Sequence, residues 1–233
     1  KKLELPLWNP YSFSGTPLLA NFQSAPFYVF NILFFIMPFT IAWSLIIFLA
    51  PVLSGIFLFL YLDNLKLSKW ASILGAITFS FSGFFIGHIQ HLNFIQSASF
   101  LPWLVYLAMN MYSNKNTVNI GLFSLILSQQ IFAGHLQMPA LTLIFIFLFT
   151  VYLSSFKITA TLKNWRILLF AFFISLLLSL IQIIPSRELL ANSIRAGGFN
   201  SVSSLQYAYP FKHFLTFLNP FILGKVSNGT YSA

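Results

Sequence analysis

The chain has 233 residues, of which 58% are hydrophobic and only 6% are charged, and it contains no cysteine. A soluble domain carries about 25% charged residues, so this composition excludes an ordinary soluble protein, and the lack of cysteine excludes disulfide and thiolate chemistry within these residues. The net charge is +9, but the basic residues are scattered between long apolar runs, which argues against nucleic acid as a partner. The composition predicts an all-α, polytopic helical membrane protein with one membrane domain.

The first element along the chain is a turn-rich stretch, residues 5–28, with the sequence LPLWNPYSFSGTPLLANFQSAPFY. Its prolines block regular helix, Gly15 allows positive φ, and Asn9 can cap its own backbone. The aromatic residues, Trp8 among them, are equally consistent with a belt in the lipid headgroups. That belt would not explain Asn9, Gly15 or Gln23. We therefore expect a fixed, non-helical loop that folds back over the mouth of a helical bundle and binds something there.

Six membrane spans are predicted after this stretch, preceded by a short surface helix within residues 27–37. The third span is short, and Pro102 near its start suggests a tilted or partly re-entrant helix; Pro185 is expected to end the sixth. The predicted organisation is an outer loop (1–39), a six-span bundle (40–185) and a second outer loop (186–233), all part of a longer protein cut at both ends. The predicted spans are 40–62, 70–88, 97–112, 117–134, 138–155 and 166–185.

The basic residues predict the orientation of these spans. The loops after the first, third and fifth spans all lie on one side of the membrane, and the positive-inside rule makes that side cytoplasmic. The opening loop, the polar breaks after the second and fourth spans, and the tail then lie on the outer face. The loop residues that decide this are Lys66, Lys69, Lys115, Lys157, Lys163 and Arg166.

Four histidine and glutamine positions in the outer breaks are candidate binding residues. His88 and His91, three residues apart, could share a metal ion on one helix face. No acid or cysteine follows nearby to complete such a site, so hydrogen bonds to backbone or to lipid phosphate are the preferred interpretation. His135 and Gln137 lie in a break that starts with glycine. They form either a polar turn or part of a pocket.

A short amphipathic segment after Pro185 offers groups for phosphate. Arg187 and Arg195 carry guanidinium groups that match phosphate oxygens, although anionic lipid headgroups would attract them as well. Glu188 is a weak candidate base, and pairing with Arg187 is the preferred interpretation. The sequence has no nucleotide-binding motif. A lipid-linked donor therefore fits the outer face better than a free nucleotide.

The residues quoted above also resemble a known family. The stretch PLWNPYSFSGTPLLANFQSAPFY resembles the opening signature of the YfhO family of bacterial membrane proteins, and three later blocks agree in order and spacing. Two departures are Val29, where the family usually has proline, and Leu136, where proline is common. The agreeing blocks are the break with His88 and His91, the block Gly134-His135-x-Gln137, and Gln182-x-x-Pro185 followed by Glu188, Leu189, Ser193 and Arg195.

The resemblance implies a function and a location. The YfhO family resembles GT-C glycosyltransferases, which implies a multi-pass protein of the bacterial cytoplasmic membrane that moves a sugar from a polyprenyl-phosphate donor to an envelope polymer such as teichoic acid. The catalytic acid of such a protein is expected before Lys1, and a divalent cation stays open as a cofactor. The phosphate would contact Arg187 and Arg195. The candidates for the remaining substrate contacts are Trp8, Asn9, Gln23, His88, His91, His135 and Gln137.

A different class of function stays open at this stage. The chain could be a non-enzymatic transporter or accessory protein for an envelope lipid or polymer, which would line a path at mid-membrane depth with polar groups. The first, fourth and sixth spans carry only uncharged polar residues there, such as Ser124, Gln129 and Ser175. That pattern argues against ion-coupled transport but not against passive movement of lipid.

Overall fold

A computed structural model describes residues 7–12, 14–114, 117–193, 196–198, 210–224 and 229–230. The chain is mostly helical, which confirms the predicted all-α class. Residues 1–189 form one compact unit and residues 190–233 a second, in which the 3₁₀ helix η3 (Phe211–Phe217) follows Pro210. Before the long helices come two short strands, β1 (Trp8–Asn9) and β2 (Thr16–Pro17), the 3₁₀ helices η1 (Phe22–Ser24) and η2 (Val29–Ile32), and the one-turn helix α1 (Leu33–Ile36).

The helices that follow are apolar along most of their length. Four helical stretches are long and apolar enough to cross a membrane, namely α2, the α3–α4 pair, the α5–α6 pair and α9. Two shorter apolar helices, α7 and α8, have 16 and 17 residues. The six-span count therefore stays a prediction. The bounds are α2 (Phe39–Asn64), α3 (Lys69–Ser80), α4 (Gly83–Gly87), α5 (Leu92–Ser99), α6 (Leu101–Asn114), α7 (Thr117–Phe132), α8 (Gln137–Leu153) and α9 (Ile158–Ala191).

The predicted third span is wrong at its start. Helix α5 begins at Leu92, so residues 93–96 are helical rather than part of a polar break, and the stretch Leu92–Tyr112 reaches 21 residues. The reason is that the polar side chains of α5 face the protein interior: Gln96 is 1% exposed and Ser97 is fully buried. Pro102 lies in the first turn of α6, where its missing N–H removes no helical hydrogen bond.

The predicted boundaries of the sixth span are also wrong. Helix α9 begins at Ile158, so Lys163 and Arg166 belong to the helix and not to a preceding loop. It continues through Pro185 to Ala191. Proline removes one backbone hydrogen bond, but a continued helix still satisfies the other backbone groups, and apolar surroundings favour that outcome strongly. The extra turns carry Ser186, Arg187 and Glu188 on the helix.

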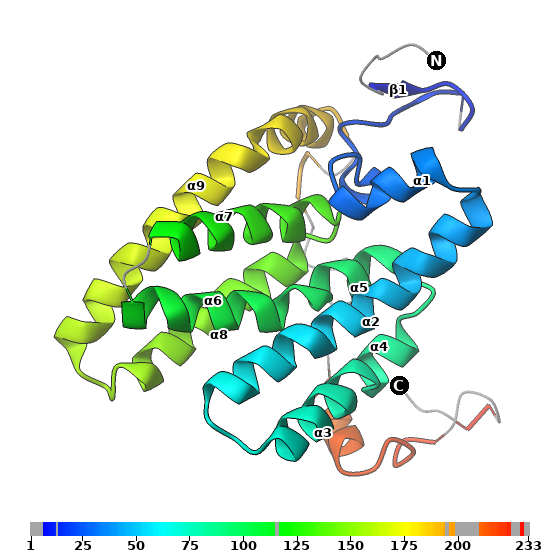
Figure 1. Cartoon of the computed structure of the whole chain (residues 1–233). Helices are drawn as coiled ribbons and strands as arrows, with labels where there is room; N and C mark the ends of the chain where they lie inside the picture. Colours follow the sequence, from blue (N-terminus) through cyan, green and yellow to red (C-terminus); the bar gives the residue numbers. More distant parts are fainter. Residues whose placement is uncertain are drawn as a thin grey trace. The chain divides into compact units, whose positions relative to one another are not determined.

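The α5–α6 pair lies at the centre of the bundle, between α2 and α7 (Figure 1). Its neighbours pack closely because aromatic rings stack and small residues let backbones approach. Phe57 of α2 stacks on Trp103 of α6, with ring centroids 3.8 Å apart. Ser124 of α7 donates a hydrogen bond to the carbonyl oxygen of Ala171 in α9, at 2.8 Å. These contacts fix the helices whose ends carry the candidate residues.

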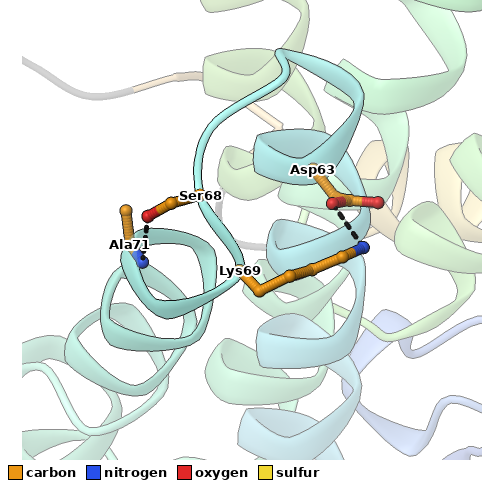
Figure 2. Close-up of polar contacts among 4 residues, drawn as sticks. All are labelled: Asp63, Ser68, Lys69 and Ala71. Atoms are coloured by element: carbon orange, nitrogen blue, oxygen red, sulfur yellow. Dashed lines mark hydrogen bonds and ion pairs between the residues drawn. The ribbon is translucent and has the colours of Figure 1, made fainter.

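The helices alternate in direction, so every second connection falls at the same end of the bundle. One end, called the basic end here, has the turns 65–68 and 154–157 with Lys66 and Lys157. There Lys69 forms an ion pair with Asp63 at 2.7 Å, and the Ser68 hydroxyl caps α3 by accepting from the Ala71 N–H (Figure 2). The opposite end, called the site end, has the opening residues, the break 88–91, the break 133–136 and the last turns of α9.

Candidate functional site

The opening residues at the site end start with a small hairpin. Strand β1 pairs antiparallel with β2, so that Trp8 lies opposite Pro17 and Asn9 opposite Thr16. Gly15 closes the turn at a φ of 110°, as its sequence context predicted. A Cβ atom at Gly15 would come within 2.5 Å of the Trp8 ring. Glycine is therefore required both for the backbone conformation and for the approach of the indole.

The polar group of Asn9 is used within this hairpin. Its Oδ1 accepts from the N–H of Tyr11 at 3.0 Å, and its Nδ2 donates to the Ser12 hydroxyl at 3.1 Å. This is the self-capping role that the sequence predicted for asparagine in a turn. Trp8 is 56% exposed and offers a free apolar surface beside it. Of these two candidates, Trp8 is the better placed to meet a ligand.

The chain then turns inward and packs on the helix ends. Asn21 caps η1 by accepting from the Gln23 N–H at 3.1 Å, and Ala25 takes a left-handed conformation with a φ of 46°. Tyr28 is buried, which raises the pKa of its hydroxyl well above the usual value, and its ring meets Phe100 edge-on at 6.2 Å. The side chain of Gln23 points out and is exposed.

Side chains from three different helices hold the backbone of the opening segment, defined from here on as residues 7–29. Each hydrogen bond is made to a main-chain group of the segment, so each one fixes the path of the backbone directly. Buried polar groups need such partners, and a missing partner costs about 1–3 kcal/mol. The bonds run from Gln182 to the Leu19 carbonyl, from Ser186 to the Ala20 carbonyl at 2.7 Å, from Asn93 to the Gln23 carbonyl at 3.1 Å, and from the Val29 N–H to Gln129 Oε1 at 2.9 Å.

These four residues were not predicted from the sequence as a group, and Asn93 was not among the predicted site residues. Gln129 stood out only as an uncharged polar residue within a span, and Gln182 only as part of a family block. The signal that could have found them is position, because each lies within the first or last few turns of an apolar helix. Polar side chains at such positions commonly bind exposed backbone at a bundle end.

Three of the four histidines of the chain meet at the site end around one phenylalanine. The ring of His135 lies 3.7 Å from the Phe94 ring, measured between centroids, and His88 stacks on the same ring at 5.1 Å and 14°. His91 lies 6.2 Å from Phe94 and 6.0 Å from His88. We call His88, His91 and His135 the imidazole cluster. The structure therefore joins two breaks that the sequence had placed on the same face.

The two half-buried imidazoles differ in their hydrogen bonding. Nδ1 of His88 lies 2.9 Å from the Phe84 carbonyl oxygen and donates to it, which leaves Nε2 as an acceptor in the neutral ring. Nδ1 of His135 is shielded from solvent and has no hydrogen-bond partner among the described residues. Burial lowers the pKa of His135 below its ordinary value.

Among the residues that the structure describes, no group of three or more histidine, cysteine, aspartate or glutamate side chains is arranged to hold a metal ion. His88 has the backbone partner that the sequence favoured, the carbonyl oxygen of Phe84. The ring contacts bring the three imidazoles together around Phe94.

The remaining candidates lie at the margins of this end. Gln137 is exposed at the first position of α8, and Arg187 and Glu188 are exposed on the last turns of α9. Arg195 lies outside the described residues. Within the described part of the chain, no hydrogen bond or ring contact joins Trp8, Asn9 or Arg187 to the imidazole cluster. In the structure, Gln23 thus lies near the imidazole cluster, whereas the hairpin with Trp8 and Asn9 and the guanidinium of Arg187 form separate groups.

No family model matches the chain, and no curated protein or solved structure matches it. The resemblance to the YfhO family therefore stays a prediction from the quoted motifs.

Proposed function

We propose that the chain forms part of a GT-C-type membrane glycosyltransferase, which transfers a sugar from a polyprenyl-phosphate donor to an envelope acceptor such as teichoic acid. The reaction would take place at the site end, on the outer face of the bacterial cytoplasmic membrane. The observation that carries the proposal is the opening segment, which is fixed by its backbone onto the bundle end beside the imidazole cluster. A segment without α-helix that is held in this way is suited to binding rather than to membrane crossing.

The position of the site end suits a lipid-linked donor. The isoprenoid part of such a donor lies among apolar helices, while its phosphate lies at the depth of the helix ends. Arg187 is exposed in the last turns of α9, just beyond the apolar part of that helix. A guanidinium group binds phosphate oxygens through two parallel N–H groups. In the proposed reaction it would hold the donor phosphate and stabilise the charge that develops as the phosphate leaves.

The sugar would meet the exposed carboxamide of Gln23 and the imidazole cluster. Hydroxyl groups need both donors and acceptors, and in the neutral ring Nε2 of His88 is an acceptor, because its Nδ1–H is engaged by the Phe84 carbonyl. A general base must remove the proton of the acceptor hydroxyl. Within this chain, Glu188 stays the weak candidate for that base.

One observation favours the second candidate function, a transporter or accessory protein for envelope lipid. Three buried polar side chains lie inside the bundle near the site end, where Gln130 donates through Nε2 to the Ser97 carbonyl and the Thr142 hydroxyl, both at 2.9 Å. The Nε2 of Gln96, close by in α5, is buried without a partner among the described residues. Such groups could mark a polar path.

The test uses the full-length protein in lipid vesicles with a set of labelled polyprenyl-phosphate sugars and isolated envelope polymer. Transfer of label to the polymer supports the enzyme, whereas movement of the lipid across the bilayer without transfer supports the alternative. Arg187→Ala is expected to raise the KM for the donor about tenfold or more, because a hydrogen bond to a charged group contributes about 1.5–3 kcal/mol. Arg166→Ala, a matched change near the basic end, should leave the KM unchanged.

Each outcome of these variants has a clear meaning. Wild-type kinetics in Arg187→Ala would remove the phosphate role from that residue, and the same result in Arg195→Ala would remove it from the other arginine. An equal loss in Arg166→Ala would show that the KM follows general damage to the bundle and not a contact at the site end.

A further inference from the structure

One side chain at the site end connects segments that are far apart in the sequence. Asn93, the second residue of α5, is half-buried, and its Nδ2 donates to the Gln23 carbonyl at 3.1 Å and to the Ala133 carbonyl at 2.7 Å. The first carbonyl belongs to the opening segment and the second to the break between α7 and α8. Both N–H bonds of the carboxamide are thus used to join these two segments to α5.

The backbone next to Ala133 is shaped for this junction. Gly134 has a φ of 91°, a conformation that L side chains rarely adopt. A Cβ atom at this position would come within 2.5 Å of the Phe22 carbonyl oxygen and 3.2 Å of the Gln23 Cα, and it would collide with Asn93 Nδ2. Only glycine therefore allows the opening segment and the carboxamide to approach the break this closely.

From this geometry we infer that Asn93 is a positioning residue, which sets the spacing between the two halves of the proposed sugar site. Gln23 lies on one side of its carboxamide. His135 and Gln137 follow Ala133 on the other side, and Phe94, on which His135 packs, is the next residue in α5. The inference rests on the proposed function, because it assigns these groups to one bound sugar.

Loss of Asn93 should shift this spacing without releasing the opening segment. The bonds from Gln182, Ser186 and Gln129 do not involve Asn93, and they hold the segment at other points. The expected change is therefore local. Gln23 and the imidazole cluster would sample a wider range of separations, while the helical bundle stays folded.

The structural test measures that separation directly. The chain has no cysteine, so spin labels can be attached to Gln23→Cys and to Leu136→Cys, which is 48% exposed in the wild type. Electron paramagnetic resonance should give one narrow distance distribution. Asn93→Ala is expected to broaden it at least about twofold, since the net loss of one or two hydrogen bonds frees the junction. Asn110→Ala, which removes a hydrogen bond to Asn64 at the basic end, is the control.

An isosteric variant separates positioning from folding. Asn93→Asp keeps the shape of the side chain but presents no donor to the two carbonyls while it is ionised. In acid its carboxyl group is protonated and can donate to one of them. The distance distribution of Asn93→Asp should therefore narrow as the pH falls, relative to Asn93→Ala at the same pH. Equal widths in wild type, Asn93→Ala and Asn93→Asp would overturn the positioning role.

The functional test uses the same Asn93 variants, without spin labels, in the sugar-transfer assay. Asn93→Ala should raise the KM for the lipid-linked sugar about tenfold with a smaller change in kcat, and Asn93→Asp should recover part of the loss in acid. If the wild type transfers no sugar, the proposed function fails while the distance measurement still decides the positioning role. If transfer is found but Asn93→Ala has wild-type KM and a broadened distribution, the two segments do not act on one sugar.

Discussion

Replacement of Gly134 by alanine is the most severe small change that the structure predicts at the site end. Alanine at a φ of 91° costs about 1–3 kcal/mol in backbone strain. Its Cβ would also displace the Phe22 carbonyl, 2.5 Å away, and the carboxamide of Asn93, whose two hydrogen bonds contribute about 0.5–1.5 kcal/mol each. The sum is a loss of about 2–6 kcal/mol in the free energy of unfolding, with relaxation of the opening segment favouring the lower part of that range.

The free energy of unfolding can be measured by titration of the protein with sodium dodecyl sulfate in mixed micelles. Gly121→Ala is the matched control, because Gly121 lies within α7 and a Cβ there would meet nothing within 4 Å. That change should stabilise the protein by up to about 1 kcal/mol, since alanine loses less backbone freedom than glycine in a helix. A Gly134→Ala protein that unfolds within about 0.5 kcal/mol of wild type would refute the close approach described for this turn.

Three further predictions concern the same end and its orientation. Because burial lowers the pKa of His135, the unfolded state binds a proton more readily than the folded state does. The stability linked to His135 is therefore fully present above the unfolded-state pKa of about 6.5 and is lost as the pH falls through and below that value. The melting temperature of His135→Gln should drop less than that of wild type between pH 7.5 and 5. Gln182→Ala should speed the reaction of a thiol reagent with Leu19→Cys about tenfold, since Leu19 is 7% exposed and its carbonyl loses a partner; an unchanged rate would show that this bond does not hold the segment. An impermeant maleimide should label Leu67→Cys and Ile89→Cys from opposite sides of intact vesicles, and labelling from one side would contradict a membrane crossing by α3 and α4.

The sequence predicted the helices better than it predicted their ends. Long apolar runs decide where helices form in a membrane, and the predicted spans over α7 and α8 agree with the structure within a few residues. The errors came from polar residues that were interpreted as breaks. Gln96 faces the interior of the bundle, and Lys163 lies on the first turns of α9. Composition alone does not distinguish a polar residue that ends a helix from one that faces inward.

The site was predicted as a region but not as a set of contacts. Loop order and charge placed the histidine breaks and the opening residues at one end, and the ring contacts around Phe94 bring His88 and His135 together. Asn93 was missed because it fell in the predicted polar break before the third span, whereas α5 already begins at Leu92. Its partners, Gln23 and Ala133, are distant in the sequence, and only the fold brings their carbonyls to one carboxamide.

The opening segment is attached through main-chain groups, and this affects how freely its amino-acid sequence can vary. A carbonyl oxygen presents the same acceptor whatever side chain its residue carries, so Gln182, Ser186 and Asn93 would hold many different sequences at positions 19, 20 and 23. Residues that face outward, such as Gln23, can then be exchanged without loosening the segment. A binding preference at this end could be redesigned, or could diverge between relatives, independently of the fold that supports it.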